Sequence, residues 1–180
     1  KGGNIQMSRV YAVPAGTGVY VKSKKTLTQQ TTFQIPVTTE LPYYVNMFVG
    51  VPDGKTVKPL EDVNGVRCIT LSFAISKSTG MPAFFPNMEE KSYGMNKMYL
   101  RLPGSLLPDV YQQLIDKEND NTDDDNGIGN PDDNGDNLVR NLEVGIQFDE
   151  EENMSITGIS EASPLNVIRE MINGSTGNKL

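Results

Sequence analysis

The sequence of 180 residues contains no histidine, no tryptophan and a single cysteine, Cys68. Most enzymatic chemistry near neutral pH relies on imidazole, on a thiolate or on a clustered metal shell. Without histidine there is no Ser-His-Asp triad, no Cys-His pair and no imidazole-based zinc site. The lone cysteine excludes an internal disulfide and any Cys-x-x-Cys motif. We therefore expect a chain that is not an enzyme, with hydrolysis through paired carboxylates as the remaining catalytic alternative. Its stability is expected to come from packing.

Long apolar runs are also missing. Apolar residues make up 37% of the chain and the mean hydropathy is −0.40, and no run approaches the roughly 20 residues that a membrane-spanning helix needs. Residues 1–7 include a lysine and glycines but no apolar signal-peptide core, so we expect any export signal to lie outside this sequence. The segment itself is expected to have no membrane span.

The charge is unevenly distributed. The net charge is −7, and residues 118–136 contain eight acidic side chains and no lysine or arginine, so the remainder carries 16 basic and 15 acidic residues. A nearly neutral body lacks the basic stripe that binds a phosphate backbone. We expect no nucleic acid partner.

Short β-type runs separated by turn residues recur over the first hundred positions, a spacing typical of a sandwich or barrel. Residues 9–13 and 18–22 flank the turn Pro14-Ala15-Gly16-Thr17 and predict a hairpin. Further strands are predicted at 31–37, 46–51, 56–58, 66–76, 80–85, 97–102 and 138–148, with residues 86–96 as a loop.

The strand over residues 66–76 has the clearest pattern. Ile69, Leu71, Phe73 and Ile75 occupy alternate positions, which predicts that they face the core. Cys68 then lies on the opposite face with Thr70 and Ser72, where we expect a half-buried structural thiol without chemistry.

One helix is predicted after Gly104, because apolar residues then recur at intervals of three and four. Ser105 is the expected cap, and Pro108 lies in the first turn, where a missing N–H is harmless. Residues 164–172 predict a second short helix with Ser163 as its cap.

The predicted fold is mainly β: an antiparallel β-sandwich with one or two short helices and an acidic Asp/Asn/Gly-rich loop. We expect a single domain over residues 5–159, with residues 116–137 inserted as the acidic loop. Residues 160–180 are expected to form a C-terminal linker with the second helix.

Four short blocks, in this order and spacing, resemble a known family. They are residues 13–22, residues 46–50, residues 98–103, and Phe148-Asp149-Glu150 leading to Thr157-Gly158-Ile159. The chain resembles the β-rich module near the C-terminus of many Bacteroidetes secreted and surface proteins, including some with leucine-rich repeats. The resemblance implies an extracellular or cell-surface location, with the periplasm as an alternative, and it implies no catalytic residues.

The acidic loop contains Asp-Asp-Asn-Gly twice, eight residues apart. Carboxylates on glycine-permitted turns are what Ca²⁺ coordination needs, although the spacing does not fit an EF-hand. The alternative is a solvated acidic loop that repels itself. The candidate metal ligands are Asp123, Asp124, Asp125, Asn126, Asp132, Asp133, Asn134 and Asp136.

Three tyrosines in Pro- or Gly-containing loops, Tyr43, Tyr44 and Tyr93, are candidate ligand-binding residues, because exposed rings can stack on sugars or on a partner protein. The alternative is that these rings pack over the sheet edge with their hydroxyls in water. Residues 149–152 are all acidic, but neighbouring carboxylates alternate sides in an extended chain, so we expect a solvated charge run.

These observations predict a non-catalytic structural or interaction module of an exported bacterial surface protein. Its expected partners are the other domains of its parent protein. The alternative is an adhesin-like module that binds a surface glycan or a host or bacterial protein, with Ca²⁺ as a stabilising ion in either case.

Overall fold

The structure is a computed structural model, and it describes residues 3–23, 26, 28, 32, 34, 36–39, 46–120 and 142–160. Residues 31, 33 and 35 of the strand predicted at 31–37, the predicted helix at 164–172 and all eight candidate metal ligands lie outside the described residues. The described elements are β1 (Gly3–Gln6), β2 (Phe48–Val51), β3 (Lys55–Val57), β4 (Leu60–Val63), β5 (Val66–Ile75), β6 (Pro82–Pro86), β7 (Lys91–Tyr93), β8 (Lys97–Pro103), the 3₁₀ turn η1 (Gly104–Leu106), α1 (Pro108–Asp120), β9 (Val144–Phe148) and β10 (Met154–Ile159).

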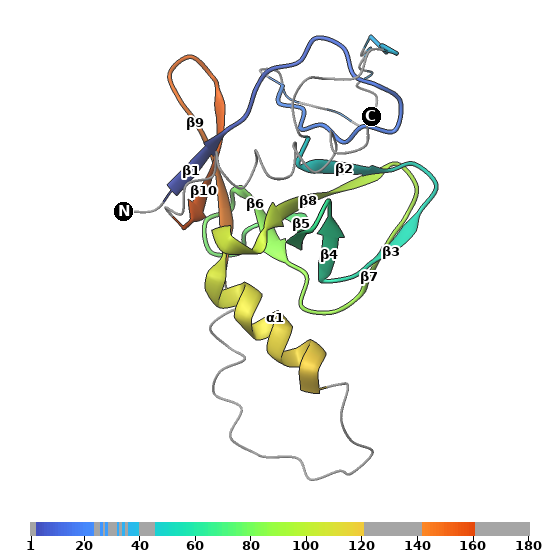
Figure 1. Cartoon of the computed structure of the whole chain (residues 1–180). Coiled ribbons are helices and arrows are strands. Elements are labelled where there is room, and N and C mark those ends of the chain that lie inside the picture. The colour runs from blue at the N-terminus through green and yellow to red at the C-terminus, as the bar shows by residue number, and fades with distance from the viewer. Residues whose placement is uncertain are drawn as a thin grey trace, which may run out of the picture.

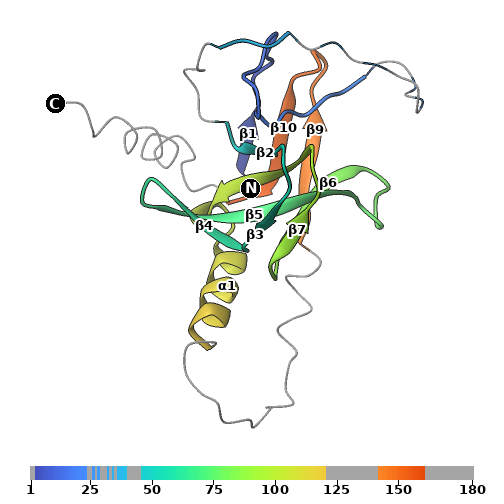
Figure 2. The ribbon, with the colours of Figure 1, turned by 90° about the vertical axis from the view of Figure 1, so that its right-hand side faces the viewer.

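Eight strands form one antiparallel sheet in the order β1-β10-β9-β6-β5-β8-β2, with β4 also paired to β5. The strands β3 and β7 form a separate two-stranded ribbon. The sheet curls, so that β9 and β10 stand upright where β5 and β8 run across (Figures 1 and 2). The prediction of a mainly β, antiparallel fold with a short helix is confirmed. The described strands form one curled sheet and a small ribbon, so the sandwich arrangement itself is not confirmed.

The main core lies on one face of this sheet. It joins side chains from β1, β2, β5, β6, β8, β9 and β10 to the start of α1. Leu71, Phe84, Leu100 and Ile156 are fully buried, and Val110 and Leu114 of α1 pack against them in the same cluster. The rest of α1 extends away from the sheet in both views (Figures 1 and 2).

The prediction that alternate residues of β5 face the core holds for only half of the strand. Ile69 and Leu71 are fully buried, but Phe73 and Ile75 are 42% and 58% exposed. The register explains the difference, because β8 pairs with β5 only from Cys68 to Leu71, and the end of β5 continues past its partner on that side.

The opposite face of β5 is more buried than predicted. Cys68 and Thr70 are fully buried and Ser72 nearly so, where the alternation predicted a half-buried face. The ribbon covers this side, and Val57 of β3 and Tyr93 of β7 belong to a second apolar cluster around Tyr99. Alternation identifies two faces of a strand, but it does not reveal what covers each.

The predicted N-terminal hairpin is wrong. Its turn forms, since the Thr17 N–H donates to the Pro14 carbonyl at 3.2 Å. Within the described residues, however, the two flanking runs are not strands and do not pair with each other: Val13 forms an isolated bridge with Val37, and Thr17 forms one with Val49. The N-terminal strand is β1 instead, which pairs with the last strand, β10.

Two smaller predictions also need correction. The expected loop at 86–96 contains β7, and Ser105 lies inside η1 and is not the cap of α1. The helix itself is confirmed, with Pro108 as its first residue. Gly104 is required before it, because a Cβ there would lie 2.3 Å from the Tyr111 ring.

Candidate binding groove

A groove of about 610 Å³ opens between the N-terminal segment and one end of the curled sheet. One wall is residues 5–11 and the other is residues 17–20, Lys22 and residues 46–48, with Phe148 and Met154 also in the lining. Because β1 and β2 are the two terminal strands of the sheet, the groove lies where the sheet would have to close to become a barrel. We call residues 7–11 the first arm and residues 18–22 the second arm.

The second arm is fixed to β2 by close backbone contacts. The Asn46 side chain donates to the Gly18 carbonyl at 2.8 Å and accepts the Phe48 N–H at 3.0 Å. A Cβ on Gly50 would lie 2.2 Å from the carbonyl oxygen of Gly16. The turn therefore rests directly on β2, and a side chain at position 50 would push it away.

The first arm is held at the other side of the sheet. The Met7 N–H donates to the Met154 carbonyl at 2.8 Å, and the Arg9 guanidinium donates to the carbonyl of Glu151. The arm thus follows β10 and then leaves it, while the second arm follows β2. The arms are separated because each is attached to a different end of the sheet.

The lining of the groove is mainly apolar and aromatic. The Tyr20 ring contacts Phe73 and Phe148 at centroid distances of 5.9 and 6.3 Å, and burial raises the pKa of its hydroxyl. Tyr11, by contrast, is 87% exposed at the rim. Lys22 places its Nζ 3.9 Å from the Phe148 ring centroid, so its charge is held over an aromatic face.

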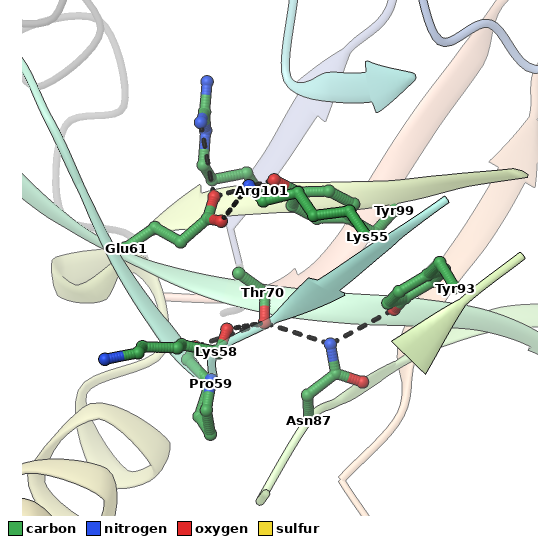
Figure 3. A network of polar contacts seen from close by, with 9 residues as sticks. All are labelled: Lys55, Lys58, Pro59, Glu61, Thr70, Asn87, Tyr93, Tyr99 and Arg101. Carbon is green, nitrogen blue, oxygen red and sulfur yellow. Dashed lines mark hydrogen bonds and ion pairs between the residues drawn. The ribbon is translucent and has the colours of Figure 1, made fainter. Parts of the chain in front are cut away.

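Two networks of polar side chains lie between the ribbon and the sheet (Figure 3). In the first, the Glu61 carboxylate accepts hydrogen bonds from Tyr99 at 2.7 Å and Lys55 at 3.0 Å, and it pairs with Arg101 at 3.4 Å. Burial alone would raise the pKa of Glu61, but these donors and cations outweigh it and lower the pKa below 4.5. Burial and the bond to Glu61 also raise the pKa of Tyr99.

The second network is centred on Asn87, whose amide donates to Thr70 at 3.0 Å and to the Tyr93 hydroxyl at 3.2 Å (Figure 3). Ser72 donates to the Asn87 side-chain carbonyl and lies 2.6 Å from the Tyr93 hydroxyl. Since the Ser72 proton is already used, the Tyr93 hydroxyl donates to Ser72. Tyr93, a predicted ligand-binding residue, therefore has its hydroxyl inside the protein.

The remaining predicted positions have simple placements. Tyr43 and Tyr44 lie outside the described residues.

Burial raises the pKa of Cys68 to about 11, so its thiol stays protonated at neutral pH. In an exposed turn, Asp149 accepts hydrogen bonds from the Asn153 side-chain amide at 3.0 Å and from the Asn153 backbone N–H at 2.7 Å, and both lower its pKa. In the part of the chain that the structure covers, no three Asp, Glu or Cys side chains gather to hold a metal.

The groove residues Tyr11, Tyr20, Lys22 and Phe148 were missed by sequence reasoning. The alternation over both arms was visible, but it predicted a closed hairpin and hence no groove between them. The contact of Tyr20 with Phe148 joins positions far apart in the chain, so no local pattern could predict it.

The four blocks that carry the family resemblance lie next to one another. Residues 13–22 contact β2 through the Thr17–Val49 bridge, and β2 pairs with β8, which contains the third block. The fourth block spans the end of β9 and part of β10, which pair with each other. The first, second and fourth blocks contribute residues to the groove lining, and the third block lies in β8 beside β2.

Comparisons of the chain with protein-family models, with curated proteins and with solved structures find no match. Among the helices that the structure describes, none is long and apolar enough to cross a membrane.

Proposed function

We propose that the chain is a non-catalytic interaction module of an exported bacterial cell-surface protein and that it holds its partner in the groove. The observation that carries this proposal is the groove itself: an apolar and aromatic concavity of about 610 Å³, bordered by both terminal strands of the sheet. Concave apolar sites with a few polar groups are the usual form of a binding site.

A non-catalytic role is supported by the hydrogen bonds and burial of the side chains that could react. Glu61 is saturated by Tyr99, Lys55 and Arg101, and the buried hydroxyl of Ser72 is held by Asn87 and Tyr93. Cys68 is buried with a raised pKa. A catalytic acid, base or nucleophile needs a free position beside a substrate, and these groups have structural partners instead.

Export to the surface is supported by the resemblance to Bacteroidetes secreted and surface modules, and residues from three of its four blocks line the groove. In such a parent protein the module would space or present other domains. Fractionation of cells that express the full-length gene product tests this: surface or extracellular protein is expected, and protein confined to the cytoplasm would contradict it.

The binding role is tested with two matched double variants. Y11A/K22Q removes one exposed apolar side chain and one lysine held over a ring at the groove. M95A/K91Q removes the same kinds of group at the ribbon, where Met95 is 68% exposed and the Lys91 Nζ lies 5.9 Å from the Tyr93 ring centroid. On peptide and glycan arrays, Y11A/K22Q should lose the wild-type hits and M95A/K91Q should keep them. Equal behaviour of the two variants would rule out the groove as the binding site.

The second candidate function is an adhesin-like module that binds a glycan or a host protein, and the exposed Tyr11 ring at the rim favours it. Hits on glycans alone would support this candidate over binding to another domain.

Either function is compatible with stabilisation by Ca²⁺ through the acidic loop. A ligand that binds only the native state raises its stability. The thermal midpoint in millimolar Ca²⁺ should therefore fall when a chelator is added, and an unchanged midpoint would exclude a calcium-stabilised module.

A further inference from the structure

The groove has a feature that identifies the kind of partner it fits: its two walls are polypeptide arms rather than a ring of side chains. Seven consecutive residues, 5–11, line one wall, and residues 17–20 with Lys22 line much of the other. Continuous lining of this kind places main-chain groups, as well as side chains, along the groove.

These main-chain groups are available for pairing. Within the part of the chain that the structure describes, residues 8–11 and 19–22 form no backbone–backbone hydrogen bonds, and the described strands pair with only one side of β1. Unpaired extended backbone is a template for the addition of another strand. An apolar groove beside such an edge provides the side-chain pockets that strand addition also uses.

The charges at the groove indicate the sign of the partner. Its charged lining residues are Arg9, Lys22 and Glu152. Arg9 donates to a carbonyl, and Lys22 is held over Phe148. In the described part of the chain, the Lys22 amine has no carboxylate within ion-pair distance. Arg9 lies beside the acidic turn at residues 149–152, which offsets its charge. Lys22 is therefore the positive charge of the lining that can pair with a carboxylate of the partner.

From these observations we infer that the groove binds an extended peptide segment with alternating apolar and acidic side chains, which adds as a strand between the two arms. Its apolar side chains contact Met7, Tyr20 and Phe148, and an acidic side chain pairs with Lys22. This inference rests on the proposed function, since it specifies the partner of the same groove.

The experiment uses fluorescence anisotropy with a labelled peptide of eight residues, alternating valine and aspartate and blocked at both ends. Two peptide analogues and one competitor separate the contributions of charge, backbone hydrogen bonds and apolar contact. In the first analogue, lysine replaces aspartate; in the second, alternate amides are N-methylated, which removes backbone donors. The competitor is the unlabelled fatty acid dodecanoate, which has no peptide backbone.

We expect the aspartate peptide to bind the wild-type chain and the lysine and N-methylated analogues to bind at least tenfold more weakly. K22Q should weaken binding of the aspartate peptide roughly two- to fivefold, the usual size of one exposed ion pair, and K91Q should leave it unchanged. Both lysines are exposed, so neither variant threatens the fold.

Three results would overturn the inference: no binding of the aspartate peptide, equal binding of the N-methylated analogue, or equal affinity for K22Q and wild type. Full displacement of the peptide by dodecanoate together with equal binding of the N-methylated analogue would identify the groove as a site for acyl chains instead. Failure of the proposed function is a different result: Y11A/K22Q and M95A/K91Q would then give the same hits on the arrays.

Discussion

At the scale of single residues, the closest contact between the N-terminal turn and the sheet is made by two glycines. Gly50 lies in β2 under the backbone of Gly16, and Gly16 has a φ of 74°, in the left-handed region that glycine adopts freely. The position of the second arm, and hence one wall of the groove, depends on this contact.

Replacing Gly50 with alanine should therefore destabilise the protein. The new Cβ would meet the Gly16 carbonyl, which is backbone and cannot rotate away, and overpacking of this kind costs about 1–3 kcal/mol. Urea unfolding of G50A measures the cost. The control is G94A, because a Cβ on Gly94 meets nothing within 4 Å, and equal stability of the two variants would contradict the contact.

Glu61 makes a second residue-scale prediction. Its pKa is lowered in the folded state from the ordinary 4.5, so its contribution to stability is present above about pH 4.5 and is lost as the pH falls through the folded-state pKa. E61Q should be less stable than wild type at pH 7, and the gap should narrow as the pH falls below 4.5. Free energies of unfolding across this range test the prediction.

The exposed residue Glu89 provides the control, since E89Q should follow the wild-type curve at every pH. A constant gap between E61Q and wild type from pH 7 to pH 3 would mean that ionisation of Glu61 does not stabilise the fold.

At the scale of elements, the ribbon of β3 and β7 turns the polar face of β5 into a buried one. Its tyrosine, Tyr93, closes the network of Ser72, Asn87 and Thr70. Polar groups on a covered face are tolerated because they satisfy one another, and each unsatisfied one would cost free energy.

Y93F should therefore cost about 1–2 kcal/mol, because it leaves Ser72 and Asn87 with one partner fewer. Y11F removes the same hydroxyl from a ring that is 87% exposed and should change stability by no more than about 0.5 kcal/mol. Thermal or urea unfolding compares them. If Y93F is as stable as Y11F, the Tyr93 hydroxyl has no structural role. The prediction that Tyr93 binds a ligand would then stand.

Element by element, the sequence predicted strands whose apolar alternation is long, such as β5 and β8, and the amphipathic helix α1. It missed β1, β4 and β10, which are held by partners that pattern alone does not reveal. The ribbon was only half predicted, because β7 lies in a polar stretch of three residues whose strand character comes from pairing with β3.

At the scale of the whole molecule, β1 and β2 are the two ends of the curled sheet, and within the described residues they do not pair with each other. The residues between β1 and β2 in sequence begin and end at these two edges, and residues 7–11, 17–20 and 46–47 among them line the groove. Closure of a sheet removes its edges; among the strands that the structure describes, these two edges stay separate, with space between them for a partner strand.

The groove could not have been predicted from the sequence. A hairpin and a pair of separated arms share the same alternation and the same turn, and only the attachment of each arm to a different end of the sheet distinguishes them. The candidate residues that sequence reasoning selected, Tyr93 and the acidic loop, were chosen for composition, whereas the groove arises from topology.

The most direct test of this account is hydrogen exchange of the backbone amides, measured residue by residue in the free protein. Amides of residues 8–11 and 19–22 should exchange far faster than those of β5 and β8, because unpaired backbone has no hydrogen bond to open before exchange. Protection of these arms equal to that of β8 would show that they are already paired with each other or with another strand. In that case there is no open groove for a partner to fill.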